Sequence, residues 1–229
     1  MPLPAVGQPP LRETPVAPRF AVSEHFPVLA QLVGEPQLAP LERGFGAFLE
    51  AAGEANGARL LPTYLAGVPA FRDRPELAEV AAFEWALATS AAAPESPPLP
   101  PEELEGVTAD AWPSLRIALH PALIRVGTEW NSVALWRAAR QGTRLPRAVP
   151  EAGARTWAVW RQDGRTRFRA LPPDDAWALD LAARGRPVGD IARALGHWLP
   201  ARETGPFAAR MLGDWLDAGW VTDLGSSHG

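Results

Sequence analysis

The residues that could hold a metal ion are few and widely spaced. The chain has no cysteine, and its four histidines are His25, His120, His197 and His228. Metal sites built from sequence neighbours place histidine or cysteine ligands only a few positions apart, and no two of these histidines are so close. We therefore predict no metal site and no cofactor in this chain, and a packed imidazole at His120, which precedes Pro121.

The motifs of nucleotide binding and of nucleophilic catalysis are also missing from the sequence. It contains neither the glycine-rich loop with lysine nor the G-x-G-x-x-G pattern that holds phosphates, and no G-x-S-x-G nucleophile motif. Glu84 is the one acid inside a strongly apolar helical pattern, and an arginine partner is a better prediction for it than catalysis. Since no nucleophile, base and oxyanion donor come together, we predict that the chain is not an enzyme.

One row of charged residues has the spacing of a binding surface. Arg165, Arg167 and Arg169 alternate with Thr166, Phe168 and Ala170, and alternate residues of a strand lie on the same face of a sheet. The row is either an ordinary solvated face or a basic strip for an acidic partner segment.

Helical periodicity dominates the chain up to about residue 148. Apolar residues recur at helical spacing in residues 20–33, 41–52, 75–87 and 131–140. Residues 115–119 alternate as in a strand, and residues 61–71, with two prolines, resemble a loop. Residues 1–19 are proline-rich and show no periodicity, so they are predicted to be a disordered arm.

The pattern changes after a segment rich in Pro, Gly and Ala at residues 145–153. Two strands are predicted around an Asp163-Gly164 turn, followed by helices at residues 174–184, 188–198 and 204–218 and a short strand at 220–224. This order is typical of a winged helix. The predicted fold is α+β and mainly α, with a helical domain at residues 20–148 and a winged-helix-like domain at residues 155–224.

The charge distribution argues against nucleic acid, although winged helices often bind DNA. Residues 1–150 contain 12 arginines and 16 acids, and residues 151–229 contain 10 of each. DNA-binding domains usually have a basic excess, because phosphate contacts supply much of their affinity. The sequence also shows no signal peptide and no membrane-spanning stretch, so a cytoplasmic protein is expected.

Several segments together resemble the HvfC/BufC family, which includes the methanobactin accessory protein and is described as a putative DNA-binding domain. The similarity spans roughly residues 20–171. It is carried by Phe26-Pro27, residues 32–35 (LVGE), 77–86 (with FEWA at its end), 115–121 (LRIALHP) and 133–138 (VALWRA). The resemblance implies a protein that works beside a multinuclear iron-dependent oxidative enzyme of TIM-barrel fold, in which the enzyme carries the iron.

A second resemblance covers residues 157–224. Residues 171–177 (LPPDDAW), 188–195 (VGDIARAL) and 207–220 are similar to the peptide-recognition element of PqqD-like proteins, winged helices that bind the leader of a ribosomally made precursor peptide. The resemblance implies a slot between a strand and the third helix. Its expected members are Arg165, Arg167, Phe168, Arg169 and Ala170 on the strand, and Phe207, Arg210, Met211 and Asp214 on the helix.

Three functional hypotheses follow from the sequence. The favoured one is an adaptor that binds the leader peptide and presents it to the iron enzyme; the others are a DNA-binding regulator and a structural subunit without peptide contact. Trp112 and Trp130 are predicted in exposed loops and are the candidates for the interface with the enzyme, because interface cores favour tryptophan.

Overall fold

A bundle of short helices forms the first part of the chain in the computed structural model, which describes residues 20–54, 57–104, 106–196 and 200–226. These helices are, in order, α1 (Val22–His25), α2 (Pro27–Val33), α3 (Glu35–Ala52), α4 (Leu61–Gly67) and α5 (Glu76–Ala92). Phe26, Phe45 and Leu77 are fully buried between them. The predicted arm at residues 1–19 lies outside the described residues, as do His197 and His228.

The loop predicted for residues 61–71 is wrong. This segment forms α4 and the 3-10 turn η2 (Pro69–Phe71), preceded by another 3-10 turn, η1 (Ala58–Leu60). Its prolines suggested a loop, but Pro62 and Pro69 each stand in the first turn of their element. At that position a missing N–H costs no helical hydrogen bond, so proline favours a helix start there.

A three-stranded antiparallel sheet lies at the centre of the molecule. It has the order β2-β3-β4, from β2 (Ile124–Trp130), β3 (Pro150–Gln162) and β4 (Arg165–Leu171). The predicted hairpin at Asp163-Gly164 is confirmed: both residues have positive φ, 52° and 69°, as a tight two-residue turn requires.

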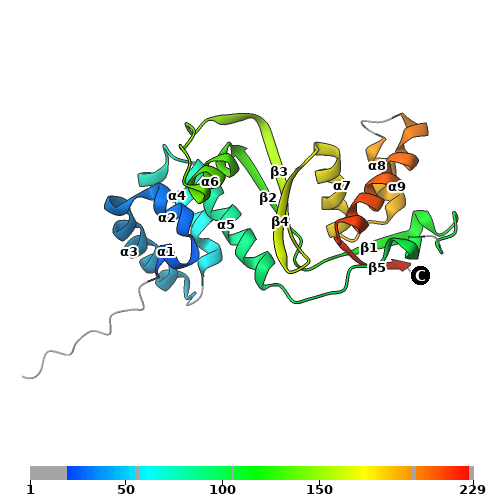
Figure 1. Ribbon diagram of the computed structural model, residues 1–229, viewed down its shortest axis with the longest axis horizontal. Helices are drawn as coiled ribbons and strands as arrows, with labels where there is room; N and C mark the ends of the chain where they lie inside the picture. Colours follow the sequence, from blue (N-terminus) through cyan, green and yellow to red (C-terminus); the bar gives the residue numbers. More distant parts are fainter. Residues whose placement is uncertain (1–19, 55–56, 105, 197–199, 227–229) are drawn as a thin grey trace, which may run out of the picture.

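The second half of β3 is covered by apolar groups on both of its faces. Trp157 and Val159 belong to a core with α5 and α6 (Ser132–Gln141), whereas Ala158 and Trp160 belong to a core with the C-terminal helices. The sheet therefore stands between two helical layers, with α1 to α6 on one side and α7 to α9 on the other (Figure 1).

The C-terminal layer holds α7 (Pro173–Ala183), α8 (Val188–Leu195) and α9 (Ala201–Asp217). A second, two-stranded sheet borders it, in which β1 (Leu115–Leu119) pairs antiparallel with β5 (Val221–Ser226). Short 3-10 turns, η3 (Pro101–Leu104) and η4 (Trp112–Ser114), lie before β1. The fold is thus α+β and mainly helical, as predicted.

Strand pairing crosses the predicted domain boundary near residue 150. Both β1 and β2 precede it, yet β1 pairs with β5 and β2 pairs with β3. The sequence indicated the strand at residues 115–119 but not β2. The division into two domains therefore stays a prediction, while the hydrogen bonding joins both parts.

No helix in the described ranges is long and apolar enough to cross a membrane.

Candidate functional site

The outer edge of β4 presents backbone groups that no strand of the described chain occupies. Strand β4 is the last in the order β2-β3-β4, and Arg165 pairs with Gln162 across the two-residue turn. Residues that close such a turn exchange both backbone hydrogen bonds, and bonded pairs then alternate along the ladder. Consequently Arg165, Arg167 and Arg169 bond to β3, whereas the N–H and C=O groups of Thr166, Phe168 and Ala170 point outward.

The three strand arginines share the sheet face that looks toward α7 and α9. Arg165 and Arg167 are exposed, and Arg167 lies 3.6 Å from the carboxylate of Asp163 in the turn. Arg169 is more constrained: its guanidinium is 3.8 Å from the Asp175 carboxylate and its Cζ is 4.4 Å from the centroid of the Trp220 ring. Arg165 and Arg167 are therefore the freer of the three cations.

Asp175 connects this face of β4 to the last turns of α9. Its Oδ1 accepts a hydrogen bond from the indole N–H of Trp215 at 2.7 Å. Burial raises the pKa of Asp175, and the hydrogen bond from Trp215 and the charge of Arg169 oppose that rise. The Gln162 side chain, at the end of β3, also donates to the Asp217 carbonyl at 3.3 Å, so the β3–β4 hairpin lies close to the C-terminal half of α9.

Phe168 contributes its backbone rather than its side chain to the candidate site. Its ring packs edge-to-face against Phe83, Trp136 and Trp157, with centroids 5.0, 5.6 and 6.1 Å away. Ala170 packs against the same core. Phe83 and Trp136 lie far from Phe168 along the chain, so the sequence alone did not indicate this cluster.

Arg137 was not predicted from the sequence, yet it lies beside the β4 edge. It projects from α6 with its Cζ 4.9 Å from the Phe168 ring centroid and 5.7 Å from that of Trp157. It is exposed. From the sequence it was only part of the helix predicted over residues 131–140.

The helix residues expected in the slot lie along one side of α9 but differ in exposure. Met211 is buried in the C-terminal core, because it packs inward with Leu212 and Trp215, so its side chain supports α9 from within. Phe207 is half-buried against the same core, and the Arg210 guanidinium covers its ring at 5.0 Å. Asp214 is exposed, and its charge acts on Asp175. Asp175 in turn lies beside Arg169 of β4.

The two tryptophans expected at a partner interface are not in exposed loops. Trp112 begins η4 and packs partly against the C-terminal core, and Trp130 ends β2; both are half-buried. Their assignment to an interface stays a prediction. Among the residues whose exposure the structure describes, the exposed large apolar side chains are Leu145 and Val149, between α6 and β3.

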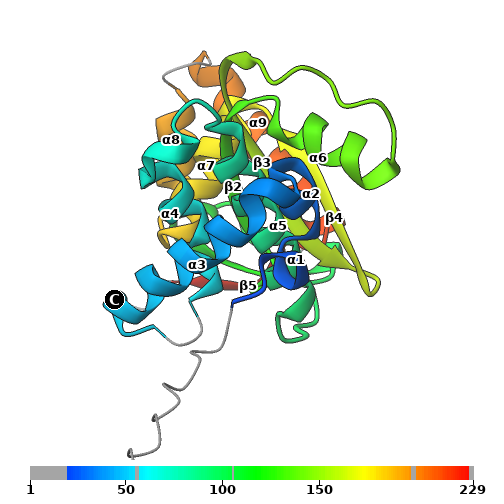
Figure 2. The same ribbon diagram turned by 90° about the vertical axis from the view of Figure 1, so that its left-hand side faces the viewer.

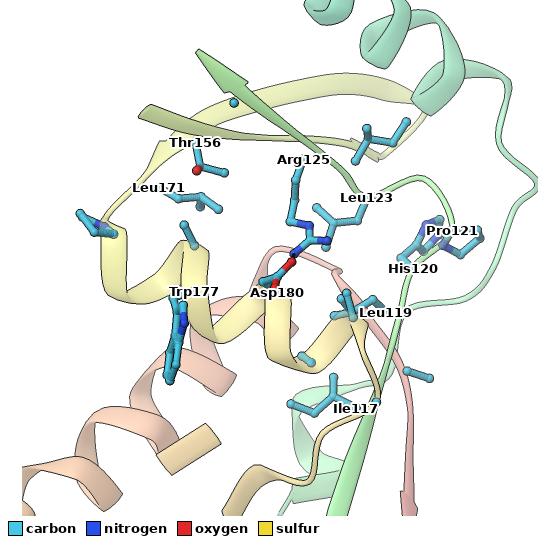
Figure 3. Close-up of a pocket in the computed structure, with 18 of the residues that line it drawn as sticks. Ile117, Leu119, His120, Pro121, Leu123, Arg125, Thr156, Leu171, Trp177 and Asp180 are labelled. Atoms are coloured by element: carbon cyan, nitrogen blue, oxygen red, sulfur yellow. Dashed lines mark hydrogen bonds and ion pairs between the residues drawn. The ribbon is translucent and has the colours of Figure 1, made fainter. Parts of the chain in front are cut away.

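A pocket of about 1100 Å³ opens toward the β2 edge of the sheet, between β1, β2 and α7 (Figure 3). Leu119, Leu123 and Trp177 are among its lining residues. Arg125 reaches from β2 to Asp180 of α7 and forms an ion pair of 2.7 Å across it. The sequence did not indicate this pocket, because it depends on β2, which was not predicted.

Glu84 is a buried structural carboxylate. Its two oxygens accept hydrogen bonds from the backbone N–H groups of Val28 and Leu29, at 3.0 and 2.8 Å, and so satisfy the free donors at the start of α2. Burial raises the pKa of Glu84, against these bonds and the charge of Arg140. The arginine predicted as a partner, Arg140, therefore acts on Glu84 only through its charge, and the backbone N–H groups of α2 are the main partners of Glu84.

The described residues contain no group of three or more His, Asp or Glu side chains that could hold a metal ion. His120 is packed as predicted: its Nδ1 accepts from the N–H of Ala122 at 3.0 Å, which leaves Nε2 to donate to the Ser96 carbonyl at 2.9 Å.

The comparisons with known proteins add no relative to this picture. No family model, curated protein or solved structure matches the chain. The resemblances described from the sequence therefore remain hypotheses, and the function has to be argued from the geometry.

Proposed function

We propose that this chain is a non-catalytic adaptor that binds the leader of a ribosomally made precursor peptide as an added strand on β4. In this proposal the bound leader is presented to a multinuclear iron-dependent oxidative enzyme of TIM-barrel fold, which carries the iron. The adaptor and its enzyme work in the cytoplasm, and the β3–β4 hairpin, α7 to α9 and β5 act as a winged-helix-like recognition element.

The observation that supports this proposal most is the free edge of β4. Thr166, Phe168 and Ala170 offer outward N–H and C=O groups in the spacing of a strand. An extended peptide that joins such an edge gains affinity from main-chain hydrogen bonds and specificity from the flanking side chains. The hairpin tip projects at one side of the molecule (Figure 2), so an incoming strand has access along it.

Rigid support of the edge is a second argument for binding. Residues 157–160 of β3 are buried from both faces, and the Phe168 ring is fixed in an aromatic cluster. The strand therefore keeps its extended form before the peptide arrives, which lowers the entropy cost of binding.

The test is a titration of the isotope-labelled full chain with the leader encoded beside its gene, together with co-elution of the chain and the enzyme from a sizing column. We expect shifts of the β4 amides and one shared elution peak. A peptide that leaves these amides unmoved, or a duplex DNA that shifts them at moderate salt where the peptide does not, would overturn the proposal in favour of a structural or DNA-binding role.

A further inference from the structure

The β4 edge has cations on both of its sides, and each side faces a different helical layer. In an added strand, side chains alternate between the two faces of the sheet. Those that share a face with Arg165 and Arg167 look toward α7 and α9. Those that share a face with Phe168 look toward α6, where Arg137 lies.

Arg137 is suited to receive a carboxylate from the second of these faces. No ion pair joins it to an acid within the ranges that the structure describes. Its guanidinium lies over the rings of Phe168 and Trp157, and a guanidinium held on aromatic faces keeps its N–H groups free for a planar anion. The stacking also fixes its position beside the edge.

The same charges disfavour the simplest competing occupant, a second copy of this chain. Pairing β4 with β4 of another copy would place rows of arginine opposite each other, and like charges across a ladder are destabilising. Charged side chains on an edge strand are a common protection against self-association. The charges of β4 therefore disfavour pairing with β4 of another copy and favour pairing with an acidic strand.

We infer that β4 selects an extended peptide with acidic residues on both faces, and that Arg137 is the specificity residue for the face toward α6. This inference rests on the proposed function. It predicts a contiguous acidic run in the bound segment, because contiguous residues of a strand alternate between the faces. An acidic residue at every second position would engage Arg165 and Arg167 and leave Arg137 unused.

Two blocked octapeptides of identical composition, half glutamate and half threonine, test the inference. In one the glutamates are contiguous, and in the other they alternate with threonine. Binding to the full chain is followed by amide shifts of Thr166, Phe168 and Ala170 at low salt. For the original protein we expect tighter binding of the contiguous peptide.

The decisive comparison uses Arg137→Met, which keeps an apolar stem over Phe168, with Arg144→Met as a charge-matched control in the exposed segment after α6. Arg137→Met should weaken the contiguous peptide about three- to tenfold, the range of an exposed but well-oriented ion pair, and leave the alternating one within twofold. Arg144→Met should change neither.

The outcomes separate the inference from the function on which it rests. If both peptides shift the β4 amides and Arg137→Met weakens both equally or neither, the specificity role of Arg137 is wrong and strand addition stands. If neither of these peptides nor the natural leader moves those amides, the proposed function itself fails. Thermal unfolding of each variant checks that the aromatic cluster is intact.

Discussion

Removing one outward N–H from β4 is the sharpest perturbation of a strand-addition site. We choose Thr166→Pro, because the N–H of Thr166 points away from β3 and its loss leaves the internal ladder intact. Thr166→Val is the matched control, since it removes the hydroxyl and keeps the backbone donor. Phe168→Pro would remove a similar donor but would also take an aromatic ring out of the cluster around Phe83.

The expected loss of affinity in Thr166→Pro follows from the hydrogen bonds that the variant cannot make. A strand bound along Thr166, Phe168 and Ala170 makes up to two backbone bonds at each residue. Proline at position 166 removes one donor and leaves the facing peptide carbonyl without a partner, which costs about 1–3 kcal/mol. That corresponds to a loss of affinity of roughly five- to a hundredfold.

The assay is calorimetry or an amide titration with the natural leader, at one salt concentration. Thr166→Pro should weaken binding by that amount, and Thr166→Val by less than about twofold, with unfolding temperatures close to that of the original protein. Arg167→Pro is a useful contrast, because its N–H bonds to β3 and its loss should unfold the hairpin. Undiminished affinity in a folded Thr166→Pro variant would refute backbone pairing at this edge.

Three further predictions follow from the same contacts. Changing Arg165 and Arg167 together to Glu should weaken the binding of an acidic leader by about ten- to a hundredfold, because neither side chain is held in the core. The loss should be smaller at high salt. If the affinity measured by calorimetry is unchanged at every salt concentration, the two arginines are an ordinary solvated face. Because burial raises the pKa of Glu84, its contribution to stability is fully present below the ordinary glutamate range and is lost as pH rises through the raised pKa. In denaturant unfolding, the free energy of unfolding of the original protein should therefore fall relative to that of Glu84→Gln as pH rises from the ordinary glutamate range through the raised pKa of Glu84. If the difference between the two proteins stays constant or rises over this pH interval, the argument from burial is wrong. Phe83→Ala should cost about 3–5 kcal/mol, because the ring is fully buried at the centre of the aromatic cluster, and a smaller loss in denaturant unfolding would mean that the cluster repacks.

The sequence predicted local structure well where one segment determines it. The Asp163-Gly164 turn, the alternation at residues 115–119 and most helices carry their signals in neighbouring residues, and the structure has them. The loop predicted for residues 61–71 was wrong because proline favours the first turn of a helix but disrupts a helix interior. For this segment, the position of each proline in the first turn mattered more than the proline content of the segment.

The candidate site was only partly predictable, since its geometry depends on contacts distant in sequence. The spacing of Arg165, Arg167 and Arg169 was enough to place them on one face. Nothing in the sequence indicated that Arg169 would be held by Asp175 and Trp220, or that Arg137 would lie over Phe168. Such contacts arise when α6 and α7 pack on opposite faces of the sheet.

Hydrogen exchange along β4, with and without the leader, tests the central claim most directly. In the free protein the amides of Arg167 and Arg169 should already be protected by β3, while those of Thr166, Phe168 and Ala170 exchange fast. Bound leader should slow the exchange of these outward amides and change the inward ones little. If the leader binds and the outward amides stay fast, or if protection appears instead around the pocket of Arg125 and Asp180, the peptide does not add to β4 and the account is wrong.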